Sequence, residues 1–310
     1  MDLFEEMQGA KPFLKWAGGK RQLIPAIQAA LPDSLRHAHN LTYVEPFIGG
    51  GAVLFWMLQA YPNIRQAIIN DINPDLATAY QVVQQRPQEL IKALMAIQEA
   101  YYRLPSEIVR RAYFEELRAE FNTRPLEAVR NTAVLIFLNR TCFNGLYRVN
   151  SKGGFNVPFG RYEQPAICHP QTILADSQLL ARVTILQGDF AQVLDHAPAN
   201  SFFYFDPPYK PLSKTAAFNA YATETFDATS QERLATFCRE LDARGNQWLL
   251  SNSDPQNTDA ADSYFDDLYA DFTIRRIQAK RHINSKAEGR GKISELLISN
   301  YVPAPEAQFA

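Results

Sequence analysis

Long apolar runs and a marked excess of one charge are missing from this sequence, and we expect no signal peptide. The longest obvious apolar run, Ala133 to Leu138, is far shorter than the roughly 18 residues that a membrane-spanning helix needs. The first sixteen residues, MDLFEEMQGAKPFLKW, include acids and lack the apolar centre of a signal peptide. We therefore expect a soluble, cytoplasmic protein.

Cysteine and histidine are too scarce to form a disulfide framework or a metal centre. Cys142, Cys168 and Cys238 form no CxxC pair, so we expect reduced thiols. His37 and His39 are the only close histidine pair, and no cysteine or carboxylate cluster flanks them. The sequence predicts no metal site.

What is present is an ordinary globular composition with an uneven distribution of charge. The chain has 310 residues, 46% hydrophobic and 21% charged, enough for two domains or for one domain with an insertion. The net charge of −2 hides three basic segments, at 11–21, 139–162 and 275–292. They could converge into a groove that follows phosphates, or lie on three unrelated faces. Charge alone leaves both readings open.

The first half of the chain contains the pattern of a nucleotide-binding α/β unit. A predicted strand, Leu41 to Val44, runs into the glycine turn 49–51 and an apolar helix, and a second strand ends at Asp71. Gly49 lets the backbone approach a ligand, and a carboxylate at Asp71 can accept hydrogen bonds from ribose hydroxyls. A tight corner between strand and helix remains the simpler alternative.

Two other nucleotide motifs fail on the letters. A dinucleotide fingerprint needs a third small residue where Leu54 stands. A P-loop needs glycine at Leu14 and serine or threonine at Arg21 in LKWAGGKR. A nucleoside-like ligand fits better than a dinucleotide or a triphosphate.

The remaining pattern predicts an α/β protein whose catalytic domain is interrupted. Residues 74–138 have helical periodicity, and 141–162 has the turns of a hairpin or an ordered loop. Strand character returns at 183–190 and 201–209 and near the C-terminus, while Thr229 and Glu232 form a capping box that predicts a helix start. We expect a discontinuous catalytic and cofactor-binding domain, 1–75 and 170–310, and a helical target-recognition insertion, 76–169.

The sharpest motif is Asp206-Pro207-Pro208-Tyr209, at the end of an aromatic strand. Prolines donate no N–H, so the Asp206 carboxylate and the Pro207 carbonyl oxygen are acceptors without a competing donor, and the Tyr209 ring is a flat surface beside them. Such an array suits a planar substrate that carries an amino group. A mere strand-ending turn is the simpler alternative.

Three segments together resemble the DNA adenine methylases, the Dam-like α group of N6-adenine methyltransferases that use S-adenosylmethionine. They are FLKWAGGK (13–20), VEPFIGGGAV (44–53) and DPPY (206–209), and the similarity extends to NRTCFNGLYRVN and GGFNVPFGRY. The resemblance implies a Rossmann-like methyltransferase sheet and a β-hairpin in the recognition insertion. It also implies methyl transfer to an adenine flipped out of double-stranded DNA in GATC, without a metal and as a monomer.

The resemblance also implies roles for single residues. Those near the cofactor would be Trp16, Ala17, Gly18, Lys20, Pro46, Gly49, Asp71, Asp189 and Asp206. Asp206, Pro207 and Tyr209 would carry the catalysis. DNA would be contacted by Lys15, Arg140, Phe143, Asn144, Leu146, Arg148, Pro158 and Arg161. Arg148 would read a guanine, since its guanidinium can span O6 and N7. Some relatives have tyrosine where Phe143 stands, so a hydroxyl is lost there.

Two rival functions remain open on sequence grounds. A methyltransferase of a protein glutamine amide would use the same acceptors, although the basic segments and the hairpin count against it. A nucleotide-dependent dehydrogenase would use a similar sheet, but it leaves the DPPY motif unexplained.

Overall fold

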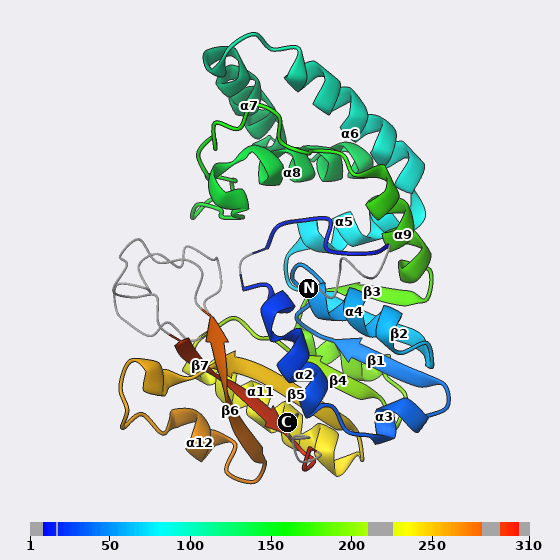
Figure 1. The fold of residues 1–310 in the computed structure, drawn as a ribbon, viewed down its shortest axis with the longest axis vertical. Helices are drawn as coiled ribbons and strands as arrows, with labels where there is room; N and C mark the ends of the chain where they lie inside the picture. The colour runs from blue at the N-terminus through cyan, green and yellow to red at the C-terminus, as the bar shows by residue number, and fades with distance from the viewer. Residues whose placement is uncertain (1–8, 17, 124, 210–225, 281–291, 304–310) are drawn as a thin grey trace, which may run out of the picture.

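The computed structural model in Figure 1 describes residues 9–16, 18–123, 125–209, 226–280 and 292–303. A twisted sheet with helices on both faces occupies one end of the molecule, and a group of helices occupies the other. Ala17, one of the residues expected near the cofactor, lies outside the described residues.

The sheet has seven strands in the order β3-β2-β1-β4-β5-β7-β6. Strands β1 to β5 are mutually parallel, whereas β7 is antiparallel to both β5 and β6. The strand bounds are β1 Leu41–Glu45, β2 Ile64–Asp71, β3 Val183–Gln187, β4 Phe202–Phe205, β5 Gln247–Ser253, β6 Thr273–Lys280 and β7 Lys292–Ser299. The order reverses between β1 and β4, which is where α/β sheets bind ligands at their carboxyl edge.

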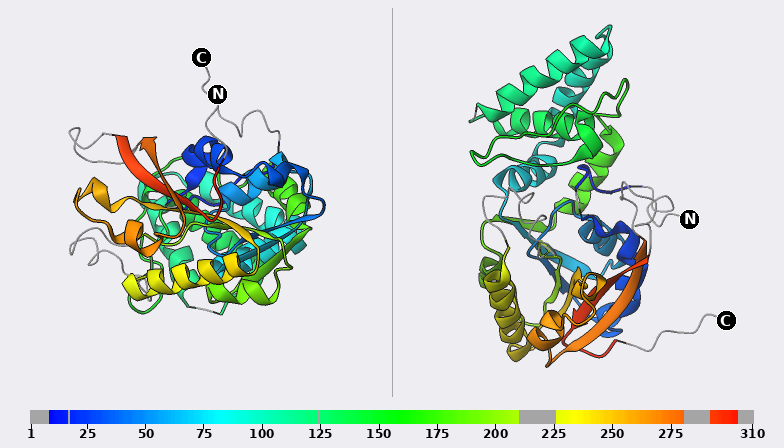
Figure 2. Two further views of the ribbon diagram at one scale, coloured as in Figure 1. Left: turned by 90° about the horizontal axis from the view of Figure 1, so that it is seen from below. Right: turned by 90° about the vertical axis from the view of Figure 1, so that its left-hand side faces the viewer.

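Apolar side chains alternate between the two faces of the sheet and form two clusters. Tyr43 and Tyr204 belong to the cluster on one face, and Val44, Phe203 and Phe205 belong to the cluster on the other. Because neighbouring residues of a strand point to opposite faces, these apolar strands are buried on both sides. Figure 2 shows helices over both faces, with α11 (Ala228–Ala243) covering one of them.

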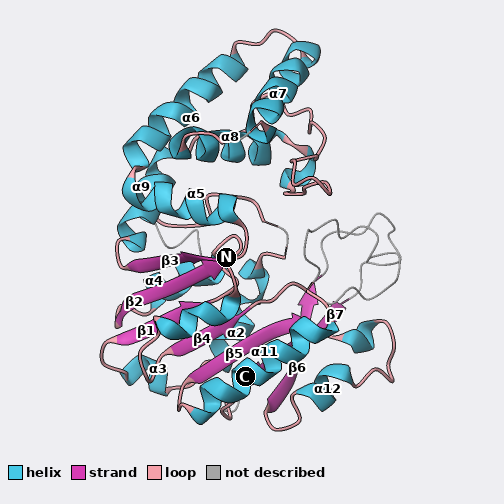
Figure 3. Cartoon of the chain, turned by 180° about the vertical axis from the view of Figure 1, so that it is seen from behind, coloured by secondary structure: helices cyan, strands magenta, loops and turns pink. Residues whose placement is uncertain are grey.

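The remaining described helices surround the sheet and build the helical end, as the cartoon in Figure 3 shows. The first five in chain order are η1 Lys20–Leu23, α2 Ile24–Ala30, α3 Ser34–His37, α4 Ala52–Ala60 and α5 Pro74–Gln85. The helical end contains α6 Pro87–Tyr102, α7 Glu107–Asn122, α8 Ala128–Thr141 and η2 Phe143–Gly145. Then follow α9 Pro170–Leu180, η3 Phe190–Asp195, η4 Pro255–Asn257 and α12 Tyr264–Leu268.

The helical end shares its core with the sheet. Phe114 of α7 and Phe137 of α8 belong to the same buried cluster as Tyr43 of β1 and Leu249 of β5. One continuous apolar core therefore links the two parts. The limits 76 and 169 for the insertion stay a prediction.

Three details of the sequence prediction differ from the structure. Helix α11 is capped by Asp227, whose side chain accepts from the Ser230 N–H at 2.9 Å, so the capping box at Thr229 was wrong. Segment 141–162 is no regular hairpin: it contains η2 and two isolated bridges, Cys142–Phe159 and Val149–Phe155. Strand β6 was not predicted, because its TIRRIQAK sequence has the charge of an exposed edge strand.

The three cysteines are buried and unpaired. Among the described helices, none combines the length and apolar character that crossing a membrane requires. In the same described ranges, no three metal-ligating side chains gather.

Candidate functional site

Asp206 stands directly after β4, where the order of the strands reverses. Its Oδ1 atom lies 2.8 Å from the Lys20 Nζ and accepts from the Ser251 hydroxyl at 3.3 Å. The side chain is 21% exposed, and Oδ2 has no hydrogen-bond partner among the described residues. One carboxylate oxygen is thus fixed by the protein, and the other is available to a substrate.

Tyr209 is held in place through its hydroxyl group. The hydroxyl donates to Glu295 Oε2 of β7 at 2.9 Å and accepts from the Lys20 ammonium, which also lies 4.3 Å from the centre of the ring. Lys20 is only 5% exposed, and its Nζ is 4.0 Å from Glu295. Lys20 therefore links Asp206, Tyr209 and Glu295 into one buried network. Sequence reasoning missed Glu295, although a lone acid inside the apolar strand ISELLIS was a visible signal.

Two carboxyl groups at this edge differ in their surroundings. Burial raises the pKa of Asp206, and the Lys20 ammonium opposes that rise. Burial raises the pKa of Glu45, at the end of β1, well above its usual range, and the Asp206 charge adds to this. The Tyr43 hydroxyl donates to Glu45 at 2.7 Å, but no cation contributes to its pKa. Both pKa values are therefore raised, but only Asp206 has a cation beside it that stabilises its ionised form.

The glycine turn and Asp71 meet at the neighbouring strand ends. Asp71 Oδ2 accepts from the Gly49 N–H at 3.1 Å, and Oδ1 accepts from the Asn73 N–H at 2.9 Å. Gly49 has a φ of 47°, in the left-handed region that favours glycine. Pro46 borders the same turn, and its carbonyl oxygen accepts from the Asn70 amide at 3.1 Å. Each carboxylate oxygen of Asp71 keeps a further lone pair for a ligand.

Trp16 connects the glycine turn with segment 141–162. A Cβ atom added at Gly50 would lie 2.9 Å from the Trp16 Cβ, so only glycine fits beneath this side chain. The indole stacks on Tyr147 with ring centres 5.0 Å apart, and the Tyr147 hydroxyl donates to Asp75 at 3.0 Å. Gly18 is exposed, and its carbonyl oxygen accepts from Lys20 Nζ at 3.3 Å.

Asp189, expected near the cofactor's adenine, lies at the start of η3. Its carboxylate accepts from the Ala191 N–H at 2.9 Å and pairs with Arg233, whose guanidinium lies 4.3 Å from the centre of the Phe190 ring. It is about half exposed. A contact with adenine stays a prediction.

The expected DNA-contacting side chains of segment 141–162 share one property, which is exposure. Phe143 is 53% exposed and Leu146 is 37% exposed, which is unusual for large apolar side chains. The others are Asn144, Arg148, Pro158 and Arg161. The Arg148 Nε donates to the Asn156 side chain at 2.7 Å, which fixes the guanidinium across the loop. The structure thus brings this set together on one exposed loop.

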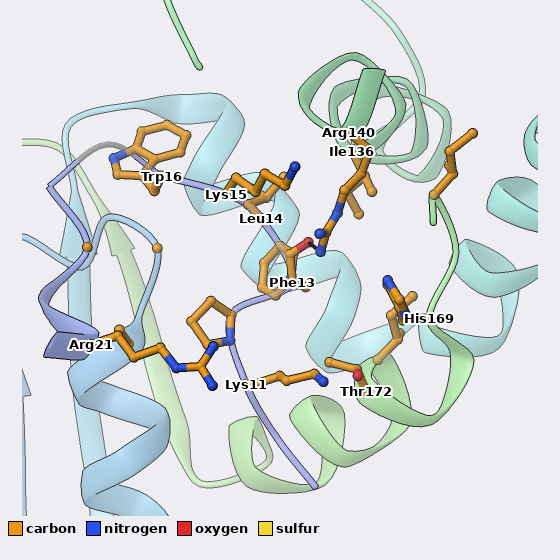
Figure 4. A pocket seen from close by; sticks show the side chains of 16 residues that line it. Lys11, Phe13, Leu14, Lys15, Trp16, Arg21, Ile136, Arg140, His169 and Thr172 are labelled. Carbon is orange, nitrogen blue, oxygen red and sulfur yellow. Dashed lines mark hydrogen bonds between the residues drawn. The ribbon is translucent and has the colours of Figure 1, made fainter. Parts of the chain in front are cut away.

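Asn139 ties this loop to the N-terminal segment, and sequence reasoning missed it. Its side chain accepts from the Lys15 N–H at 2.8 Å and donates to the carbonyl oxygens of Lys15 and Gly145 at 2.8 and 2.9 Å. The side chain is 1% exposed. The next residue, Arg140, donates to the Phe13 carbonyl oxygen at 2.8 Å (Figure 4). The only sequence signal was an asparagine that follows an apolar helical run near the end of α8.

The basic segment 275–292 is partly structural. Arg276 pairs with Asp254 at 3.0 Å and with Asp266 at 2.7 Å, and Arg275 donates to the Pro303 carbonyl oxygen at 3.3 Å. These two arginines stabilise the sheet edge. Residues 281–291, which include Arg281, Lys286, Glu288 and Arg290, lie outside the described residues.

Comparison with known proteins gives consistent matches over nearly the whole chain. Residues 16–283 match the family model "D12 class N6 adenine-specific DNA methyltransferase". The type II methyltransferase M.MjaIII of Methanocaldococcus jannaschii is 47% identical over 94% of this chain and 99% of its own length. The type II methyltransferase M1.LlaDCHI of Lactococcus lactis is 38% identical over 94% and 95%. The DNA adenine methylase of Vibrio cholerae is 34% identical over 94% and 96%.

Proposed function

The chain belongs to the D12 class of N6 adenine-specific DNA methyltransferases, and we propose that it methylates an adenine flipped out of duplex DNA within GATC, using S-adenosylmethionine. The observation that supports this best is the half-occupied carboxylate of Asp206. Lys20 and Ser251 both bind Oδ1, so Oδ2 can accept one N–H of the amino group N6. The Pro207 carbonyl oxygen would accept the other, since Pro208 supplies no N–H.

These two acceptors would set the geometry of the amino group. Two hydrogen bonds from N6 draw its lone pair out of conjugation with the purine ring and direct it at the incoming methyl group. The Tyr209 ring, held by Glu295 and Lys20, would stack on the flipped base. The rate then depends mainly on positioning, because direct methyl transfer needs no covalent intermediate with the enzyme.

The strand-end residues fit S-adenosylmethionine, which would supply an electrophilic methyl group on sulfur. Asp71 offers acceptor lone pairs at the end of β2, as a ribose requires. Gly49 and Gly18 have φ values of 47° and 81°, in the left-handed region that favours glycine. The space beside Gly18 is open, since a Cβ atom built there would meet no atom within 4 Å, so a ligand could approach the backbone. Phe47 and Phe190 pack with ring centres 5.3 Å apart and provide an apolar wall at the same edge. We propose Trp16, Lys20, Pro46 and Asp189 as its further neighbours.

The exposed loop 141–162 would enter the major groove. Arg148 would read a guanine by exchanging its Asn156 partner for base acceptors, and Phe143 with Asn144 would brace the space left by the base. We propose that a monomer binds this way and serves a restriction–modification system. Two relatives named type II methyltransferases support the latter.

One experiment tests the proposal directly. The protein is incubated with methyl-labelled S-adenosylmethionine and plasmid DNA, and the modified bases are mapped. N6-methyladenine confined to GATC is the expected result, and Asp206→Ala should abolish labelling while duplex binding persists. Methylation at another sequence would overturn the GATC assignment alone. Near-normal labelling by Asp206→Ala would remove Asp206 from the reaction.

A further inference from the structure

The two prolines of the DPPY motif lie beyond the strand pairing that holds β4. The last pair of the ladder between β4 and β5 joins Phe205 to Leu250. Neither Pro207 nor Pro208 has an N–H to donate, and each ring fixes its φ near about −65°, so the direction of each carbonyl group depends on ψ. The Pro207 carbonyl, the proposed second acceptor for N6, therefore needs a further contact to keep its direction.

A buried glutamine of α11 supplies a contact to this segment. The Gln231 Nε2 donates to the Pro208 carbonyl oxygen at 3.3 Å. The Gln231 side chain is fully buried, whereas Pro208 is exposed. An amide group is placed in the interior only where polar partners satisfy it, and here one partner is the backbone of the motif. Gln231 thus connects the interior of the molecule to the outer end of the motif.

The neighbouring strand determines which way the Gln231 amide faces. The Asn252 Nδ2 of β5 donates to the Gln231 Oε1 at 3.4 Å, and the Asn252 Oδ1 accepts from the Ser253 N–H at 2.8 Å. This chain begins at a backbone N–H, which can only donate, and ends at the Pro208 carbonyl, which can only accept. Both side-chain amides between these ends therefore have one orientation, with the Gln231 nitrogen towards the motif.

Two successive residues of β5 act on the motif from opposite faces of the sheet. Neighbouring side chains of a strand point to opposite faces. Ser251 donates to the Asp206 carboxylate at 3.3 Å, while Asn252 contacts α11, which covers the other face in Figure 2. Through α11, Asn252 acts on the Pro208 carbonyl. The Pro207 carbonyl therefore lies between two groups that the protein holds, Asp206 before it and Pro208 after it.

We propose that Gln231 is a positioning residue for methyl transfer. By holding the Pro208 carbonyl, it restricts rotation of the segment and keeps the Pro207 carbonyl directed at the amino group of the flipped adenine. Because transfer depends mainly on positioning, a misdirected acceptor lowers the rate. Gln231 is itself buried, so its loss should leave the binding of cofactor and duplex intact. The proposal rests on the proposed function.

The first test is Gln231→Met, which keeps the size of the side chain and removes the donor. The single-turnover rate at saturating DNA and cofactor should fall about tenfold. Cofactor affinity by calorimetry and duplex affinity should stay within about twofold of the wild type. Fluorescence of 2-aminopurine at the target position, which reports base flipping, should also match the wild type. Glu232→Met, the exposed next residue of α11, is the control and should keep the wild-type rate.

The second test is Gln231→Glu, in which pH switches the donor on and off. A protonated carboxyl group can donate to the Pro208 carbonyl and accept from Asn252, whereas a carboxylate can only accept. Burial raises the pKa of such a carboxyl group. The rate relative to the wild type at the same pH should therefore be close to one at pH 6 and about tenfold lower at pH 8.5. The relative rate of Gln231→Met should be equally low at both pH values. Melting temperatures at both pH values identify any unfolding.

Three outcomes would overturn the proposal. One is a wild-type rate in Gln231→Met, and another is a relative rate of Gln231→Glu that does not change with pH. The third is a loss of rate that cofactor affinity, 2-aminopurine fluorescence or the melting temperature follows equally, which would show that Gln231 supports binding or folding instead. Failure of the proposed function is recognised separately, by the absence of methylated adenine in wild-type reactions.

Discussion

At the scale of residues, Lys20 controls the charge of Asp206. The Lys20 ammonium lowers the pKa of Asp206 against the effect of burial, and only the ionised carboxylate can accept from N6 without competing as a donor. In Lys20→Met the pKa of Asp206 should rise, so the acid limb of the pH–rate profile should move to higher pH. Single-turnover methylation at saturating cofactor and DNA measures this, and Lys92→Met should keep the wild-type profile. An acid limb that moves to lower pH would contradict the prediction.

Glu295 should act through Tyr209. Glu295→Ala removes the acceptor of the Tyr209 hydroxyl, so the ring loses one of its two fixed contacts. The single-turnover rate should fall about tenfold, which corresponds to ~1.4 kcal/mol, whereas Glu295→Gln should keep most of it. Because the effect passes through the Tyr209 hydroxyl, Tyr209→Phe with Glu295→Ala should be no slower than Tyr209→Phe alone. Additive losses would show that Glu295 acts elsewhere.

At the scale of elements, the exposed loop 141–162 depends on close packing at Gly160. A Cβ atom there would lie 2.6 Å from the Cys142 carbonyl oxygen and 2.5 Å from the Tyr162 ring. Gly160→Ala should lower the free energy of unfolding by about 1–3 kcal/mol. The KM for DNA should rise, while cofactor affinity measured by calorimetry stays unchanged. Gly154→Ala, whose nearest contact would be an ordinary 3.4 Å, is the control in the same loop. Equal KM values for both variants would contradict this.

Elements with a strong local pattern were predictable, and elements that depend on distant partners were not. Strands β1, β2 and β4 follow from short apolar runs that end in polar residues. The DPPY motif, directly after β4, predicted which edge of the sheet carries the candidate site. Glu295 and Asn139 escaped prediction, because their partners lie 86 and 124 residues away. The turns Asn144–Gly145 and Gly153–Gly154 predicted a hairpin or an ordered loop, and the chain does reverse there with antiparallel backbone hydrogen bonds. The sequence did not show that side chains of Asn122 and Asn139 also hold this loop.

At the scale of the whole molecule, buried polar side chains hold together segments that are far apart in the sequence. Asn139 joins α8 to the N-terminal segment, and Trp16 stacks on Tyr147 of the recognition loop. The N-terminal segment beside the proposed cofactor site therefore also contacts the loop proposed to read DNA. Recognition and catalysis share this physical connection, and the continuous core beneath it restricts independent movement of the two parts.

Asp176 is another buried polar side chain that connects distant segments. Its carboxyl group accepts from the Lys11 N–H and so binds the N-terminal segment to α9. Because this carboxyl group can ionise, the stability of the molecule should depend on pH. Its pKa is about 8 in the folded protein, against about 3.9 in an unfolded chain. Between these values the folded state binds the extra proton, so the contribution of Asp176 to stability should be complete below pH 4 and should decline as the pH rises toward 8.

Asp176→Asn keeps the acceptor for Lys11 and cannot ionise. The variant should therefore unfold at a higher urea concentration than the wild type at pH 8.5, by an amount equivalent to more than about 1 kcal/mol, with a smaller difference at pH 5. Asp195→Asn, at an exposed position, should show no such dependence. An Asp176→Asn protein that is less stable than the wild type at pH 8.5 would mean that the carboxylate is ionised in the fold.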